Sequence, residues 1–206
     1  IALYFVSLFA VLIGTSSARA ESSEWPLLFV QPIPRSAFIL GKFFALSLMF
    51  AGLLGLLFVP TLFVRPPDPI LLALYGRTLT LAGVFVAFGL SAGFLARDRV
   101  QGLVVGVSAW LFLLFGLDLI ALLVARWSLL EQAPDLWSAV LMLNPLDSFR
   151  IDALFAMERI PAEAASHTGL TSLWLAHSGL WFVLLSIGWM IGLLFATARR
   201  LKGWEE

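Results

Sequence analysis

Residues 102–125 read GLVVGVSAWLFLLFGLDLIALLVA, an uninterrupted apolar run in which the one charged side chain is Asp118. An α-helix of about 20 apolar residues crosses the roughly 30 Å hydrocarbon core of a bilayer. The run is therefore long enough to span a membrane with some tilt. It predicts that the chain is a membrane protein.

The rest of the chain repeats this pattern. Hydrophobic residues make up 61% of it and charged residues 13%, against roughly one half and one quarter in soluble domains. Four further apolar runs are expected spans, at about 1–16, 38–64, 70–96 and 175–196. The first is shorter than a full span, so we expect the sequence to begin inside one. We predict an all-α polytopic membrane protein, with residues 1–206 as a single transmembrane domain.

The basic residues indicate how the spans are oriented. If the spans alternate, segments 17–37, 97–101 and 197–206 lie on one side. They carry Arg19, Arg35, Arg97, Arg99, Arg199, Arg200 and Lys202. The positive-inside rule makes that side, with the C-terminus, cytoplasmic and puts the long segment at about 126–172 outside. Alternatively, the stretch ending at Ala20 is a secretory signal peptide, which would invert the orientation and place the basic clusters outside.

Composition and motifs exclude several classes of function. The chain has no cysteine and a net charge of zero, so we expect neither thiolate chemistry nor a nucleic acid partner. His167 and His177 have no carboxylate or second histidine at ligand spacing, so we expect no metal site. Gly41-Lys42 is followed by Phe43 and lacks the P-loop glycine pattern, so ATP hydrolysis must come from another chain.

The segment between the first two runs predicts a short helix over about 22–31. A serine hydroxyl for the N-cap, Glu24 in the first turn and Pro26 are typical of a helix start. Pro32 and Pro34 disfavour helix at the residues before them, which leaves about two turns, too few to be stable alone. We therefore expect the helix to dock on something, the alternative being an interfacial turn that lies among the lipid headgroups.

The residues after this helix return the chain to the membrane. Arg35 is expected to lie at the headgroup level, and Lys42 to reach back from the foot of the next span. Gly41 between them is expected to allow close approach of another backbone.

Residues 21–42, ESSEWPLLFVQPIPRSAFILGK, resemble the cytoplasmic signature of ABC-2 type transporter permeases. The order of the spans, the long outer segment and the basic tail are similar as well. In that family the short helix is the coupling helix, which docks into a groove on a separate ATPase subunit. The resemblance implies an ATPase-coupling site made of Ser22, Ser23, Glu24, Trp25, Leu27, Leu28, Phe29, Val30 and Arg35.

Within the family, Gly116-Leu117-Asp118 and NPLDSFR at 144–150 look most like the permeases of nitrous oxide reductase maturation systems. The resemblance implies a homodimer in the bacterial inner membrane, cytoplasmic ABC ATPases that hold ATP and Mg²⁺, and a periplasmic β-helical partner. The complex would pass a sulfur species or mechanical work outward to assemble the copper-sulfide centre of the reductase. This chain would then bind no cofactor and perform no covalent chemistry.

The outer segment is the largest amphipathic surface expected on its side, with Pro145–Met157 as one amphipathic stretch. We therefore place the periplasmic partner on it. The residues expected to contact that partner are Asn144, Asp147, Phe149 and Arg150.

Two charges fall well inside apolar runs, Arg77 and Asp118, whereas Lys42 lies at the edge of its run. Each lies about seven residues, or roughly 10 Å, from the outer end of its run, so the two could form an ion pair. Arg77 could instead snorkel outward from a span that begins at Thr78. Asp118 could be a protonated or backbone-bonded acid that only fixes packing, or it could act on a substrate or proton.

Gly89-Leu90-Ser91-Ala92-Gly93 matches the hydrolase pattern G-x-S-x-G, but that motif needs a strand-to-helix elbow and this one lies within an expected span. His177 is expected about 20 Å from Ser91, too far for a catalytic pair. We favour helix packing through G-x-x-x-G here, at Gly102/Gly106 and at Gly188/Gly192. Two other functions stay open: a generic ABC-2 exporter of lipid, drug or haem, and, remotely, an intramembrane serine hydrolase.

Overall fold

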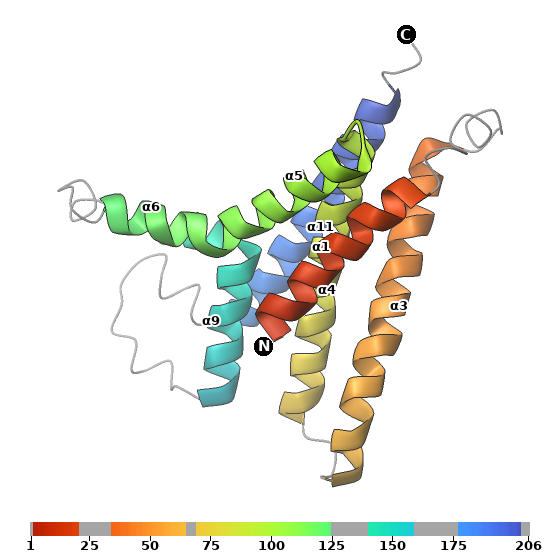
Figure 1. Cartoon of the computed structure of the whole chain (residues 1–206). Helices are drawn as coiled ribbons and strands as arrows, with labels where there is room; N and C mark the ends of the chain where they lie inside the picture. The colour runs from red at the N-terminus through yellow and green to blue at the C-terminus, as the bar shows by residue number, and fades with distance from the viewer. Residues whose placement is uncertain (1, 21–33, 65–68, 125–139, 159–176, 203–206) are drawn as a thin grey trace. The chain divides into compact units, whose positions relative to one another are not determined.

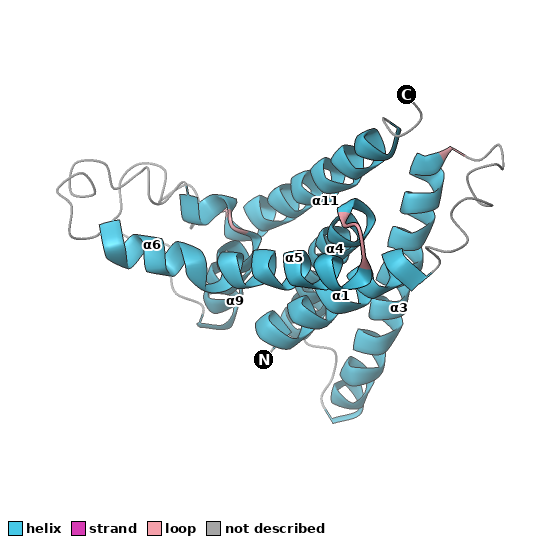
Figure 2. Ribbon diagram, turned by 45° about the horizontal axis from the view of Figure 1, so that its top comes forward, coloured by secondary structure: helices cyan, strands magenta, loops and turns pink. Residues whose placement is uncertain are grey.

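The computed structural model describes residues 2–20, 34–64, 69–124, 140–158 and 177–202, and these ranges contain helices and short connections but no strand (Figures 1 and 2). The helices are α1 (Ala2–Ala20), α3 (Arg35–Val64), α4 (Pro69–Leu95), α5 (Arg99–Leu111), a π-helical turn (Phe112–Gly116), α6 (Leu117–Val124), α9 (Pro145–Glu158) and α11 (Ser178–Lys202).

Five candidate membrane spans occur within the described residues, judged by length and apolar composition. They are Leu3–Ala20, Ser36–Thr61, Pro69–Leu95, Arg99–Ile120 and Ser178–Leu201. Each coincides with one of the apolar runs of the sequence. The protein is therefore the all-α polytopic membrane protein that the sequence predicts.

The chain divides into two compact units. The first contains Ile1–Trp110 together with Ile187–Glu206, and the second contains Leu111–Ser186. The chain passes from the first unit to the second just before the π-helical turn, and returns within α11.

Helix α4 forms the core of the first unit. Its second half is almost fully enclosed, with Leu81, Phe85, Leu90 and Phe94 all at 0% exposure. The neighbours of α4 in this unit are α1, α3, α5 and the last part of α11 (Figure 1). The side chains of α4 are hydrophobic on all faces of the helix. Such a helix is suited to burial among other helices.

Glycine allows α1 and α4 to pack at very short range. A Cβ atom added at Gly89 would collide with the carbonyl oxygen of Val11 and lie 3.0 Å from the Cα of Gly14. One added at Gly93 would lie 2.6 Å from the Cβ of Ala18. The motif around Ser91 is thus a packing motif within a continuous helix, as predicted, and not an elbow.

The two other glycine pairs behave differently from each other. Added Cβ atoms at Gly102 and Gly106 on α5 would lie 3.1 and 2.9 Å from side chains of α1, so this pair also serves packing. At Gly188 and Gly192 an added Cβ would have no atom within 4 Å. Close packing at Gly188/Gly192 is therefore not found within the described residues.

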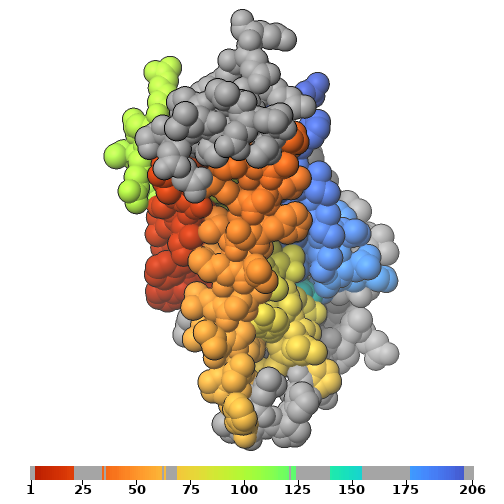
Figure 3. Space-filling model, turned by 90° about the vertical axis from the view of Figure 1, so that its right-hand side faces the viewer, coloured from red at the N-terminus to blue at the C-terminus, as the bar shows by residue number. Residues whose placement is uncertain are grey.

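Helix α3 lies beside α4 and the end of α1 (Figure 3). The hydroxyl of Tyr75 on α4 donates a hydrogen bond to the carbonyl of Ala51 on α3 (2.9 Å), and its ring packs against Phe58 with centroids 5.2 Å apart. The opposite face of α3 is exposed, as at Leu48 (75%) and Phe63 (86%). Such a face suits contact with lipid.

In the second unit, α9 packs against the start of α11. The rings of Phe149 and Phe182 meet edge to face at 5.7 Å, and both side chains are buried. Trp181 donates its indole N–H to the carbonyl of Met142 (2.8 Å). Helix α9 coincides with the amphipathic stretch that the sequence indicates at Pro145–Met157.

Candidate functional site

The predicted ATPase-coupling residues, Ser22 to Val30, lie outside the described residues. So does the side chain of Arg35, although Arg35 begins α3. Their role in ATPase coupling stays a prediction. The structure does describe the helices on both sides of this segment, α1 ending at Ala20 and α3 beginning at Arg35.

The Gly-Lys pair that follows the coupling segment has an unexpected geometry. The ammonium of Lys42 donates to the carbonyl of Ser17 in the last turn of α1 (2.8 Å), so this side chain joins two helices. An added Cβ at Gly41 would meet no atom within 4 Å. The expected close approach at Gly41 is therefore not found within the described part of the chain.

Asn144 forms a buried polar junction between α9 and the π-helical turn. It is 2% exposed, and its amide nitrogen donates to the carbonyl of Leu113 inside that turn (2.8 Å). A π-helical turn shifts the backbone pairing by one residue, and such turns are often found at functional sites. The junction therefore fixes α9 to an irregular point of the apolar run that contains Asp118.

Asn144 is also the N-cap of α9. Its side-chain oxygen accepts from the backbone N–H of Leu146 (3.2 Å), its amide donates to the Asp147 carboxylate (2.5 Å), and its own carbonyl accepts the first backbone bond of the helix, from Ser148 (3.0 Å). Pro145 occupies the first helical position, where its missing N–H costs nothing. An amide can serve two elements in this way because it both donates and accepts.

Asp147 lies in an electrostatic cluster with Asp118 and Arg150. Burial raises the pKa of the Asp147 carboxyl, and the nearby Asp118 carboxylate raises it further, while the hydrogen bond from Asn144 and the charge of Arg150 act in the opposite direction. Sequence reasoning assigned Asp118 to the membrane and Asp147 to an outer surface. The structure brings them into one site, which we call the carboxyl cluster: Asp118, Asn144, Asp147 and Arg150.

The four residues predicted to contact an outer partner are not equally accessible. Asn144 and Phe149 are 2% and 4% exposed, and both hold the second unit together. Asp147 is partly exposed and Arg150 is exposed. A partner protein on this surface would therefore meet Arg150 and Asp147, while Asn144 and Phe149 would act by positioning α9.

Arg77 lies on α4 in the first unit, and its side chain is partly buried. Asp118 belongs to the second unit. The ion pair between them stays a prediction from the sequence.

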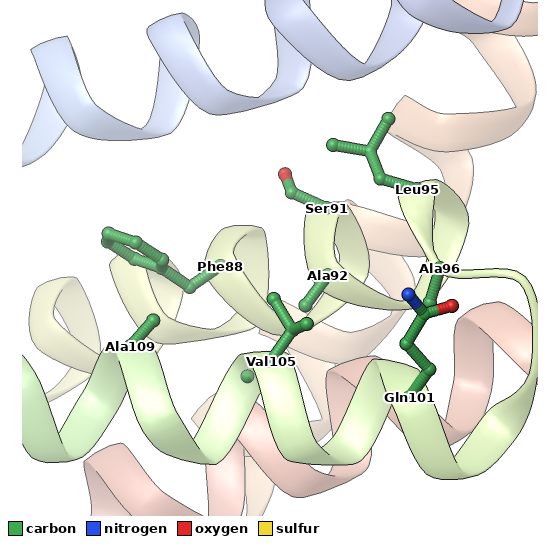
Figure 4. A pocket seen from close by; sticks show the side chains of 9 residues that line it. Phe88, Ser91, Ala92, Leu95, Ala96, Gln101, Val105 and Ala109 are labelled. Atoms are coloured by element: carbon green, nitrogen blue, oxygen red, sulfur yellow. The ribbon is translucent and has the colours of Figure 1, made fainter.

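Ser91 lies beside a pocket between α4 and α5 of about 260 Å³ (Figure 4). Its hydroxyl is 2.9 Å from the hydroxyl of Thr197 on α11, and both hydroxyls are within reach of the carbonyl of Leu193, at 3.4 and 2.8 Å. These are bonds between packed helices, and no strand-to-helix turn presents the serine. The arrangement gives no support to an intramembrane hydrolase.

Sequence reasoning missed several buried polar contacts. Asp152, 1% exposed on α9, accepts from the hydroxyl of Ser178 at the start of α11 (3.1 Å). Trp110 on α5 donates to the hydroxyl of Ser7 on α1 (2.8 Å). An acid within an amphipathic helix was a visible signal for Asp152, whereas a tryptophan and a serine in separate apolar runs offered none.

No group of three or more potential metal ligands from His, Cys, Asp and Glu occurs in the ranges that the structure describes. The carboxyl cluster holds two carboxylates, an amide and a guanidinium. Its members present a mixed charge to a partner.

One curated relative connects this architecture to a known class of protein. The chain is 30% identical over 196 residues to the probable ABC transporter permease protein NosY of Pseudomonas aeruginosa, an alignment that covers 85% of this chain and 70% of the relative. No family model and no solved structure matches the chain. The similarity extends over most of the chain, not over one local motif.

Proposed function

The chain belongs to the NosY-like ABC transporter permeases, and from that premise we propose that it couples ATP hydrolysis by a separate cytoplasmic ABC ATPase to work done on the far side of the membrane. The observation that carries the proposal is the identity with a named permease over most of a five-span helical body. The chain itself has no P-loop, which is consistent with ATP and Mg²⁺ being held by the partner.

In this proposal the segment Ser22–Val30 docks on the ATPase as the coupling helix, and Arg35 holds its far end at the membrane surface. The basic segments face the cytoplasm, and so does the C-terminus. Closure of two ATPases on ATP moves two such helices, one in each copy of a permease homodimer. The movement reaches the outer side through the spans, without covalent chemistry in this chain.

The finer proposal is that the complex matures the copper-sulfide centre of nitrous oxide reductase in the periplasm of a bacterium. Its support is the likeness of Gly116-Leu117-Asp118 and of residues 144–150 to permeases of that system, together with the name of the relative. The outward step passes either a sulfur species or mechanical work to a periplasmic β-helical protein.

The periplasmic protein is proposed to bind at α9, through Arg150 and Asp147. Arg150 is exposed and its guanidinium can pair with a carboxylate of a partner. Asn144 and Phe149 would support the surface from beneath. Charge reversal, Arg150→Glu, is expected to lower binding of the β-helical partner in a pull-down, whereas unchanged binding would remove this surface from the proposal.

The first test is gentle purification of the full-length protein from its own host, with mass spectrometry of what accompanies it. An ABC ATPase together with a periplasmic β-helical protein is the expected result. An ATPase alone would favour a generic ABC-2 exporter of lipid, drug or haem. Absence of any ATPase would overturn the coupling role.

The second test addresses the coupling segment. Glu24→Pro, which breaks the short helix, and Trp25→Ala, which removes its largest apolar side chain, are expected to uncouple ATP hydrolysis from reductase maturation while membrane insertion stays normal. Phe63→Ala is the matched control, because this aromatic ring is 86% exposed at the other end of α3. Normal coupling in both test variants would exclude docking of this segment on the ATPase.

A further inference from the structure

The ends of three helices meet, and two of these helices flank the proposed coupling segment in the sequence. Helix α1 ends at Ala20, two residues before the segment begins at Ser22, and α3 begins at Arg35, five residues after the segment ends at Val30. The last turn of α4 lies next to both, since Gly93 contacts α1 and Phe94 contacts Phe38 of α3. Any force on the segment must enter the membrane body through these helix ends.

The first link joins α3 to α1 through Lys42, whose ammonium donates to the carbonyl of Ser17 (2.8 Å). Carbonyls in the last turn of a helix have no partner within the helix, and they form the negative end of its dipole. An ammonium there makes a charge-assisted bond, roughly twice as strong as a neutral one. The same ammonium lies 5.3 Å from the centre of the Phe38 ring, one turn earlier on α3.

The second link joins α1 to α4 through Arg19, whose Nε donates to the carbonyl of Gly93 (2.7 Å). The backbone N–H that would normally serve this carbonyl belongs to Arg97, and it donates to the side chain of Gln101 instead (2.7 Å). The end of α4 thus leaves the Gly93 carbonyl available for a side chain from another helix. Glycine at 93 also lets α1 come close enough, because a Cβ there would lie 2.8 Å from the carbonyl oxygen of Thr15.

An aromatic contact completes the arrangement. Phe94, fully buried on α4, meets Phe38 of α3 edge to face with ring centroids 6.1 Å apart. The three helix ends are therefore linked in pairs: α1 with α3, α1 with α4, and α3 with α4. We call these four side chains, Arg19, Phe38, Lys42 and Phe94, the clamp.

We infer that Arg19 and Lys42 are positioning residues that make the ends of α1, α3 and α4 move together when the coupling segment is displaced. The inference rests on the proposed function. Terminal turns of helices fray easily because their backbone groups lack internal partners. Without the clamp, displacement of the segment would unwind the end of α1 or the start of α3, and the motion would be lost before it reached the span bodies.

The first experiment measures coupling in the full-length permease purified with its ATPase. Arg19→Gln and Lys42→Gln remove the charge and are expected to lower reductase maturation per ATP hydrolysed at least about fivefold, with ATP turnover changed less than about twofold. Arg19→Lys and Lys42→Arg keep a charged donor and are expected to recover most of the ratio. Arg200→Gln, an exposed arginine on α11, is the charge-matched control and should leave it unchanged.

The second experiment reads the helix ends directly. Because the chain has no cysteine, spin labels can be placed at Ala20 and Leu95 alone, both exposed at the ends of α1 and α4. With labelled protein diluted into unlabelled copies, so that distances between two chains do not contribute, pulsed EPR should give one narrow distance distribution, with and without trapped ATP. In Arg19→Gln the distribution should broaden when ATP is trapped. A distribution as narrow as in the parent protein, or an unchanged coupling ratio, would overturn the clamp.

The two proposals fail in different ways. If ATP turnover is present and Trp25→Ala uncouples it while Arg19→Gln and Lys42→Gln do not, the clamp alone is wrong. If no ATPase accompanies the permease, the coupling role is wrong, and the inferred role of the clamp in coupling is wrong as well.

Discussion

Replacing Asn144 by alanine tests the junction that joins α9 to the π-helical turn. The amide makes three bonds: to the carbonyl of Leu113 (2.8 Å), to the Asp147 carboxylate (2.5 Å) and from the N–H of Leu146 (3.2 Å). Because the side chain is 2% exposed, water cannot easily replace these partners. The substitution therefore removes a helix cap and leaves a polar backbone group of the turn without its side-chain donor.

The magnitude follows from these two losses. Loss of an N-cap costs about 1 kcal/mol, within a range of about 0.5–2 kcal/mol. Loss of the side-chain donor to the Leu113 carbonyl, in this partly buried site, costs about 1–3 kcal/mol. Asn144→Ala should therefore lower the free energy of unfolding by about 2–4 kcal/mol. Asn144→Ser can still cap α9 but is too short to reach Leu113, so it should recover about 1 kcal/mol of that loss.

The assay is unfolding in detergent, followed by helical circular dichroism and by tryptophan fluorescence. Trp181, one of eight tryptophans, contributes a signal from this site, since its indole N–H is bonded to Met142, two residues before Asn144. Leu143→Ala, at a 58% exposed neighbouring position, is the control and should change stability by less than about 0.5 kcal/mol. If Asn144→Ala behaves like this control, or if serine recovers nothing, the junction does not stabilise the fold through the cap and the bond to Leu113.

Three further predictions concern packing and charge. Gly89→Ala should destabilise the protein by about 1–3 kcal/mol, because the added Cβ collides with α1. In the same unfolding assay Gly188→Ala should be neutral or slightly stabilising, because its added Cβ meets no atom. Equal effects of the two substitutions would contradict the packing difference. The pKa of Asp147 is raised in the folded protein, so the free energy of unfolding should fall as pH rises from the ordinary aspartate pKa of about 3.9 through the raised pKa. Asp147→Asn should abolish that fall. An identical pH profile in this variant would show that Asp147 is not the group responsible. If Arg77 and Asp118 pair as the sequence predicts, Arg77→Gln and Asp118→Asn should each lower reductase maturation more than the double substitution does. The reason is that a single substitution leaves one charge unpaired. Additive losses would exclude the ion pair.

The carboxyl cluster was only partly predictable. Asp118 and Asp147 were each visible as chemically unusual residues, one in an apolar run and one in an amphipathic segment. Their proximity was not, because it depends on the π-helical turn and on the amide of Asn144 that bonds to it. A one-residue irregularity in a helix does not change the hydropathy pattern, so the sequence does not reveal it.

The sequence by itself determined the class of the protein. Apolar runs of span length can cross a bilayer only as helices, since no water is present there to satisfy the backbone, so length and hydropathy suffice to predict an all-α polytopic protein. The short segment 22–31 and its flanking charges were equally local features, and they carried the resemblance to permeases.

Tertiary structure alone decided which faces of these helices meet. Gly89/Gly93 and Gly188/Gly192 look alike in sequence, yet only the first pair lies against another helix within the described residues. Likewise, Lys42 could have reached lipid or solvent, but it bonds to Ser17. The physical reason is that helices apolar on all sides carry no stripe to mark their packing face. Rotation and register are then set by the shape of the neighbouring helices and by a few buried polar bonds.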